Sequence, residues 1–183
     1  MSQTDLYFIA LLPPAEIQQQ ATEIKQHFSD RYNSRAALKS PPHITLQPPF
    51  KWESDHLAIL YQQLNEFALQ HAPVSISLEG FAAFPPRVIY INVLKTPELL
   101  ALKAALMAHL AATLNLSDPV EHRRPFSPHL TVAFRDLTRQ HFKTAWGDFQ
   151  HRPFSAQFTV SHLTLLRHDS QRWQIHSEFR LDR

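Results

Sequence analysis

Two short stretches decide how this sequence folds: Ser40-Pro41-Pro42-His43-Ile44-Thr45-Leu46 and, 86 residues later, Ser127-Pro128-His129-Leu130-Thr131-Val132. Both stretches are typical of β-strands that begin just after a proline. Because alternate residues of a strand share a face, each strand presents an imidazole and a hydroxyl on one face and apolar side chains on the other. The rise of about 3.3 Å per residue separates the two polar groups by roughly 6.6 Å. Each strand is therefore predicted to be half buried, with a polar His-x-Thr face.

The His-x-Thr triplet by itself is weak evidence, because a third copy, His162-Leu163-Thr164, also occurs. The first two copies share a context that the third lacks. Each follows Ser-Pro, and each occupies the corresponding strand of an apparent repeat. We therefore interpret His162 as an edge-strand histidine near solvent and not as part of the site.

The order strand–helix–strand–helix–strand occurs twice along the chain. Apolar residues at steps of three and four predict the helices, and alternating or continuous apolar runs predict the strands. Corresponding elements lie 82 to 86 residues apart, which indicates an internal duplication. The expected strands are 6–12, 43–47 (ended by Pro48-Pro49), 74–78, 87–93, 129–134, 154–160, 162–167 and 173–180, and the expected helices begin near residues 15, 54, 97 and 138.

This duplication predicts an α+β fold built as one bilobal domain over residues 1–183. Repeats at about 5–80 and 87–168 are expected to form two pseudo-symmetric lobes, and a C-terminal strand at 172–180 completes the domain. The lobes would carry antiparallel sheets around a central cleft. Sites shared between two units tend to form in such a cleft.

Composition excludes several classes of site. The chain has no cysteine, which rules out disulfides, thiolate nucleophiles and Cys-ligated zinc or iron–sulfur sites. It has two glycines, Gly80 and Gly147, too few and too far apart for a Rossmann fingerprint, a P-loop or a nucleophile elbow. Twelve histidines raise the question of a metal enzyme, but no H-E-x-x-H motif or ligand-spaced Asp/Glu–His cluster is present.

Charge and hydropathy give expectations about partners and location. The formal net charge is +2 at pH 7, too small for a general nucleic-acid coat. The first residues lack the basic region of a signal peptide, and no apolar run approaches the ~20 residues of a membrane span. We therefore expect a cytoplasmic protein without a membrane partner. Nothing in the sequence implies an obligate protein partner.

The chain resembles the two-histidine (2H) phosphoesterase superfamily, which includes bacterial 2′-5′ RNA ligase-like proteins and 2′,3′-cyclic phosphodiesterases. Both His-x-Thr motifs, their separation, the strand order and the opening Tyr7–Pro14 segment carry the resemblance. The continuation of the first motif into Pro48-Pro49-Phe50 resembles the cyclic-phosphodiesterase-like branch. The Phe-Leu-Gly type of turn, more common in the RNA ligase-like branch, is absent. In addition, a basic residue often follows the second motif closely in the family, whereas here Phe134 intervenes before Arg135.

The resemblance implies a phosphoesterase that opens 2′,3′-cyclic phosphates of nucleotides or RNA ends and leaves a 2′-phosphate, a step in RNA processing. Imidazole can act as acid or base near neutral pH, so His43 and His129 can together perform this chemistry without a metal or another cofactor. Thr45 and Thr131 would donate hydrogen bonds to non-bridging phosphate oxygens. Which histidine is the base stays open at this point.

Residues that bind the substrate are harder to choose from sequence. Basic residues gather beside both motifs, and Arg124, just before the second motif, is the strongest candidate for phosphate binding. Phe50, Tyr90 and Phe126 are candidates for stacking on a nucleobase. The expected partner is a nucleotide or an RNA terminus that carries a cyclic phosphate.

Two other functions fit the same pattern. A 2′-5′ RNA ligase would run the same groups in reverse and would need room for two RNA ends. A non-catalytic RNA- or nucleotide-binding module would keep the fold and the phosphate cradle without turnover. Replacing either motif histidine distinguishes the second case, because an enzyme loses rate by orders of magnitude and a binding module loses only modest affinity.

Overall fold

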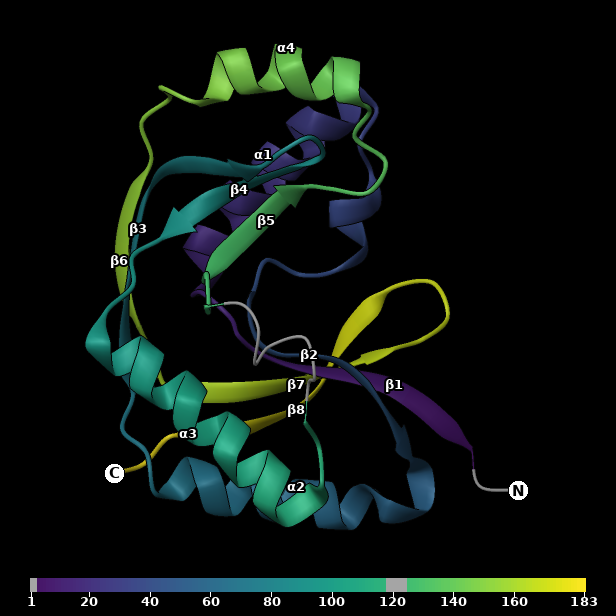
Figure 1. Ribbon diagram of the computed structural model, residues 1–183, viewed down its shortest axis with the longest axis vertical. Helices are drawn as coiled ribbons and strands as arrows, with labels where there is room; N and C mark the ends of the chain where they lie inside the picture. The colour runs from purple at the N-terminus through teal and green to yellow at the C-terminus, as the bar shows by residue number, and fades with distance from the viewer. Residues whose placement is uncertain (1–2, 118–124) are drawn as a thin grey trace.

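Two four-stranded antiparallel sheets form the frame of the molecule in the computed structural model, which describes residues 3–117 and 125–183 (Figure 1). The first sheet has the order β2-β1-β7-β8, and the second has the order β5-β4-β3-β6. The first contains β1 (Thr4–Leu11), β2 (Ile44–Glu53), β7 (His162–His168) and β8 (Trp173–Arg180). The second contains β3 (Val74–Phe84), β4 (Val88–Val93), β5 (His129–Ala133) and β6 (Ser155–Val160). The expected α+β class with antiparallel sheets is confirmed.

Among the residues that the structure describes, four α-helices and two short 3₁₀ helices connect the strands. They are α1 (Ala15–Tyr32), α2 (Leu57–Leu69), α3 (Pro97–Leu114), α4 (Arg139–Phe149), η1 (Ala36–Lys39) and η2 (Ser54–His56). Thr96 and Thr138 cap α3 and α4, because their hydroxyls accept hydrogen bonds from the backbone N–H groups of Leu99 and His141. In Figure 1, α2 and α3 lie at one end of the molecule and α4 lies at the other.

The sequence repeats and the two sheets do not coincide, because each sheet contains strands from both repeats. The third strand of the first repeat, β3, lies beside β4 in the second sheet, and β7 returns to lie beside β1 in the first. The helices cross over as well: α1 packs against β5, and α3 packs against β2 and α2. The repeats are therefore interleaved, and each sheet depends on both halves of the chain.

Two strands run further than the sequence predicts. β2 continues through Pro48 and Pro49 to Glu53 instead of ending there. Two features accommodate these prolines: β2 is an edge strand, and its register with β1 shifts between Tyr7 and Ile9. β3 likewise passes the expected end at residue 78, with Gly80 at φ +64° where the register with β4 is irregular.

The core covers one face of the first sheet, and the other face is left for smaller contacts. Tyr7, Ile9 and Leu11 of β1 belong to the main core, whereas Phe8 and Ala10 form a separate small cluster with Leu166. Among the described residues α3 is the one helix long and apolar enough to cross a membrane by length and composition. In this fold α3 packs against the core, because its side chains Leu99, Leu102, Leu106 and Leu110 are buried.

Candidate active site

The two motif histidines are held in the same way. His43 Nδ1 lies 2.7 Å from the carbonyl oxygen of Pro41, and His129 Nδ1 lies 2.7 Å from that of Ser127. A carbonyl only accepts hydrogen bonds, so Nδ1 carries the proton in each neutral ring. Nε2 is therefore the nitrogen that each histidine presents for proton transfer. In both motifs the acceptor is the residue two positions earlier, so the Pro before each histidine also shapes the turn that orients the ring.

The two rings lie within electrostatic reach of one another. The pKa of His43 is lowered to about 4, mainly by burial; the Pro41 carbonyl opposes this effect, and the positive charges of Lys25 and His129 add to it. Burial also lowers the pKa of His129, which the Ser127 carbonyl opposes. Contacts between β2 and β5 bring the two motifs together from different sheets. Both imidazoles are thus held in the neutral form more strongly than in water.

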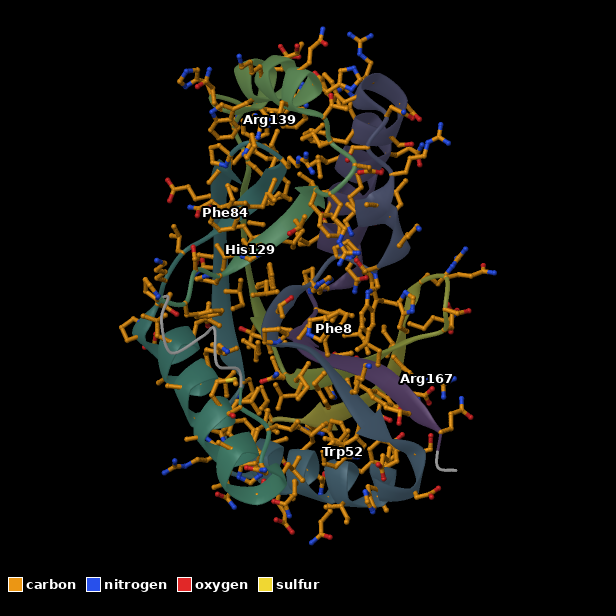
Figure 2. The ribbon with its side chains drawn as sticks, turned by 45° about the vertical axis from the view of Figure 1, so that its right-hand side comes forward. Phe8, Trp52, Phe84, His129, Arg139 and Arg167 are labelled. Carbon is orange, nitrogen blue, oxygen red and sulfur yellow. The ribbon has the colours of Figure 1, made fainter. Side chains whose placement is uncertain are left out.

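An aromatic side chain flanks each histidine from the neighbouring strand. The Phe8 ring on β1 lies 4.7 Å from the His43 ring, and the Tyr90 ring on β4 lies 5.2 Å from the His129 ring. Figure 2 shows Phe8 and His129 in the middle of the molecule, between the ends marked by Trp52 and Arg139. Phe84 is a second neighbour of His129, at 5.2 Å, and is 39% exposed.

The motif threonines lie where the strand alternation predicts. Thr45 pairs with Ala10 of β1, and Thr131 pairs with Tyr90 of β4. Both side chains are half-buried, while the intervening Ile44 and Leu130 are fully buried. Within residues 3–117 and 125–183 neither hydroxyl has a hydrogen-bond partner in the protein. The two hydroxyls are therefore available to a bound oxyanion.

Two buried lysines hold the strand that carries the first motif, and sequence reasoning missed both. Lys25 of α1 donates a hydrogen bond to the carbonyl of Ser40 at 2.9 Å, and Lys103 of α3 donates one to the carbonyl of Leu46 at 2.5 Å. Their acceptors stand three residues before and three residues after His43. Lysine is almost never fully buried, so a helical lysine in the sequence predicts a solvated side chain. Phe8 was also missed, although the repeat offset of 82 relates it to Tyr90.

The structure places the predicted substrate-binding residues in different surroundings. Tyr90 lies against His129, as described above. Phe126 packs against the core with Lys103 Nζ 5.4 Å from its ring centre. Phe50 is not brought to the site: it lies beside Tyr7 in the main core, on the face of the first sheet away from Phe8 and His43. Arg124 lies outside the described residues.

His162 lies at the start of β7, two strands away from the strand that follows His43. Its Nδ1 lies 3.0 Å from the hydroxyl of Ser161, and its neighbour across the sheet is Arg180. β7 is an inner strand of its sheet, which corrects the expectation of an edge strand. In the part of the chain that the structure describes, no group of three or more His, Asp or Glu side chains could hold a metal ion. The site is thus a pair of imidazoles with two hydroxyls, suited to proton transfer at a phosphate.

Comparison with known proteins shows which family the chain belongs to. The sequence profile of the 2′-5′ RNA ligase superfamily matches residues 13–172. A protein of Oceanobacillus iheyensis provisionally named a phosphoesterase is 28% identical over 180 residues, covering 97% of this chain and 98% of its own length. A similarly named protein of Bacillus licheniformis is 29% identical over 176 residues, with 94% and 96% covered. The chain belongs to the 2′-5′ RNA ligase superfamily of 2H phosphoesterases.

Solved structures show the same fold. The protein TT0787 of Thermus thermophilus superimposes with a TM-score of 0.68 at 20% identity, covering 96% of this chain and 97% of its own. LigT of E. coli in its apo form gives a TM-score of 0.68 at 19% identity and covers both chains fully, at 100%. LigT has also been solved in complex with 3′-AMP, which gives a TM-score of 0.67 at 19% identity with 99% of this chain covered.

Proposed function

We propose that this member of the 2′-5′ RNA ligase superfamily is a metal-independent phosphoesterase that opens 2′,3′-cyclic phosphates of nucleotides or RNA ends. The observation that carries the proposal is the matched pair of histidines. Each ring is fixed through Nδ1 to a backbone carbonyl, each presents Nε2, and the two rings act on one another electrostatically. Complexes of the related LigT with 3′-AMP and ATP support a nucleotide as the ligand.

The reaction needs one neutral and one protonated imidazole. The neutral ring accepts a proton from water at Nε2 while the water oxygen forms a bond to phosphorus. The bond from phosphorus to the ribose 3′ oxygen breaks, and the protonated ring gives its Nε2 proton to that oxygen. The product is a 2′-phosphate, and the second imidazole ends the step neutral while the first ends it protonated. Thr45 and Thr131 stabilise the charge that develops on the non-bridging oxygens.

The proposal is tested by incubating the protein with adenosine 2′,3′-cyclic phosphate in the presence of EDTA and identifying the product. We expect turnover that survives the chelator and yields adenosine 2′-phosphate. A 3′-phosphate product would show that the other bond breaks. Activity that disappears with EDTA and returns with zinc would contradict the mechanism.

The family profile itself makes RNA ligation the second candidate function. In that reaction the 5′-hydroxyl oxygen of a second RNA would take the place of water and form the bond to phosphorus, and the bond from phosphorus to the ribose 3′ oxygen would break. The two functions are separated by supplying cyclic-ended RNA together with RNA that has a free 5′-hydroxyl. A joined, 2′-5′-linked product supports ligation, and RNA that ends in a 2′-phosphate without any joined product supports hydrolysis.

A further inference from the structure

A hollow of about 220 Å³ adjoins the first motif, between α1, η1 and the turn that joins β7 to β8. It continues into a second hollow of about 510 Å³, and the two share Leu38, Lys39 and Arg172 as lining residues. We refer to the two together as the η1 groove. The smaller hollow is also lined by Lys25, Ser40, Pro41, Pro42 and Trp173.

The η1 groove is basic. Lys25, Lys39 and Arg172 line it, and no acidic residue is among the lining residues that the structure describes. Asp169 stands in the same turn as Arg172 and interacts with its charge. The carboxylate of Asp169 is occupied, however, because it accepts hydrogen bonds from the backbone N–H groups of Gln171 and Arg172 and from the side chain of Gln174. Asp169 therefore shapes the turn that presents Arg172.

Lys25 is the groove residue whose surroundings most favour a bound anion. Its side chain is 2% exposed, and its one hydrogen bond to a described residue, the bond to the Ser40 carbonyl, leaves two N–H donors of the ammonium group. Burial lowers its pKa to about 7, and no acidic group of the described residues opposes this effect. A buried ammonium without a counter-charge is costly, and a phosphate in the η1 groove would supply that charge.

The η1 groove adjoins the residues that surround His43. Pro41 lines the groove and also accepts the hydrogen bond that orients His43. Trp173 lines it and packs at 4.6 Å on Phe8, which in turn packs on His43. At about 3.8 Å per residue, the Cα atoms of Ser40 and His43 are no more than about 11 Å apart. A ligand in the groove is therefore close to a substrate held between the histidines without occupying the same place.

The 3₁₀ helix η1, which lines the groove, is held by the segment that follows the second motif. Asp136, shortly after β5, accepts hydrogen bonds from the hydroxyl of Ser34 at 2.9 Å and from the backbone N–H groups of Arg35 and Ala36 at 2.7 and 2.9 Å. These bonds hold the start of η1, and so Lys39 at its end, against the sheet that carries His129. The basic groups are thus positioned by the same framework that brings the two histidines together.

We propose that the η1 groove binds a second phosphate group of the same substrate, one attached to the 5′ side of the nucleotide whose cyclic phosphate is opened. This inference rests on the proposed function and narrows its substrate class. A second phosphate occurs as the phosphodiester of an RNA chain or as the pyrophosphate of a nucleotide conjugate. A cyclic nucleotide with a free 5′-hydroxyl would leave the groove empty and would be a poorer substrate.

Binding is measured first, with ligands that are not turned over. Calorimetry compares adenosine 3′-phosphate with adenosine 3′,5′-bisphosphate on the wild-type protein. We expect the 5′-phosphate to tighten binding at least tenfold, and the double variant Lys39→Gln/Arg172→Gln to remove most of that gain. The matched control, Arg139→Gln/Lys143→Gln on α4, removes the same charge from exposed positions that do not line the groove and should keep the gain. Equal affinity for the two ligands on the wild-type protein would overturn the inference.

Two further ligands identify the source of the phosphate. Adenylyl-adenosine 3′-phosphate carries a phosphodiester at the 5′ position, and adenosine 5′-diphosphate 3′-phosphate carries a pyrophosphate. Tighter binding of the dinucleotide supports RNA ends, and tighter binding of the pyrophosphate supports a nucleotide conjugate. The same pair made as 2′,3′-cyclic phosphates then gives kcat/KM.

The outcomes separate the inference from the proposed function. If no cyclic phosphate is opened but the bisphosphate binds tenfold tighter through Lys39 and Arg172, the proposed function fails and the groove stands. If adenosine 2′,3′-cyclic phosphate is opened and the 5′-phosphate brings no gain in binding or in kcat/KM, the groove fails alone. If the control variant loses the gain in affinity from the 5′-phosphate to the same extent, the gain comes from long-range electrostatic attraction and not from a binding site. That result would also count against the groove.

Discussion

The surroundings of His43 and His129 differ more than their own geometry does. Each ring is fixed through Nδ1 at 2.7 Å and each has an aromatic neighbour on the adjoining strand. His43, however, lies near the ammonium of Lys25, while His129 lies beside Phe84 and Tyr90. Adding 82 to the number of Lys25 gives Met107, so the equivalent position of the second repeat carries an uncharged side chain.

The difference shows how a duplicated site can become asymmetric. Two identical imidazoles in identical surroundings would share a proton equally, whereas catalysis needs one to give a proton as the other takes one. A nearby positive charge disfavours the protonated form of His43, and aromatic rings give His129 no such fixed charge. The first motif is therefore the one whose protonation the fold opposes more strongly.

The largest expected effect comes from removing either imidazole. His43→Ala and His129→Ala should each lower kcat/KM for adenosine 2′,3′-cyclic phosphate by about 10²- to 10⁴-fold. Because the two rings act in one step, the kcat/KM of the double variant should be only slightly lower than that of the less active single variant. Steady-state kinetics check this, and a loss below about tenfold for one histidine would mean that the sites are not partners.

The threonines sharpen the comparison at the next level. Thr45→Val and Thr131→Val each remove one hydroxyl donor and should lower kcat by about 10²-fold, by analogy with loss of one donor to a developing oxyanion. Thr→Ser at the same positions keeps the hydroxyl and should restore most of the rate. If valine leaves kcat unchanged in one motif and lowers it in the other, the phosphate contacts only the threonine of the second of these motifs.

The stability of the protein in acid tests the lowered pKa of His43 without any substrate. The pKa of His43 is about 4 in the folded protein and about 6.5 when exposed, so unfolding takes up a proton between these values. Its contribution to stability is present above pH 6.5 and is lost as the pH falls towards 4, by at most about 3 kcal/mol.

Urea unfolding at pH 7 and pH 4.5 measures this effect. The variant His43→Asn should lose less stability between the two pH values than the wild-type protein does. The pKa of His129 is lowered as well, so His129→Asn should act in the same direction and serves as the matched comparison. Equal pH dependence of the wild-type and the His43→Asn proteins would show that His43 is not held neutral by the fold.

The smallest expected effect concerns Lys25. Replacement by Met keeps the length of the buried side chain and removes the charge, so the pKa of His43 should rise. The limb of the pH–kcat/KM profile that reports His43 should move to higher pH by a few tenths of a unit to one unit. Thermal unfolding of Lys25→Met at pH 7 serves as the control for folding. An unchanged profile would assign the asymmetry to burial alone.

Local sequence patterns predicted most of the elements because their causes are local. Thr96 before Pro97 is a cap and first-turn signal, and the structure has a helix there. The alternation of His43, Ile44 and Thr45 gave the correct faces. Proline was misleading at Pro48-Pro49, because its effect on a strand depends on whether the strand lies at an edge, and edge position is a property of the whole sheet.

The binding residues were predicted less well, for the same reason. Tyr90 and Phe50 look alike in sequence, as aromatic residues near turns or strands beside the motifs. Register decides between them: Tyr90 pairs with Thr131 and faces the site, whereas Phe50 pairs with Tyr7 and faces the core. Lys25 was missed because no local pattern shows that a helical lysine will be buried against the carbonyl of Ser40.

The sequence by itself determined the two His-x-Thr strands and the repeat that relates them, and it suggested the chemistry proposed for them, because residue type and strand alternation are local properties. Only the tertiary structure decided that the two repeats exchange strands and helices, so that β2 and β5 from different sheets bring His43 and His129 into one another's field. The structure also placed Lys25 and the η1 groove beside one histidine and aromatic rings beside the other. Such differences depend on contacts between residues far apart in the chain, where burial and charge, and not local propensity, set the energy.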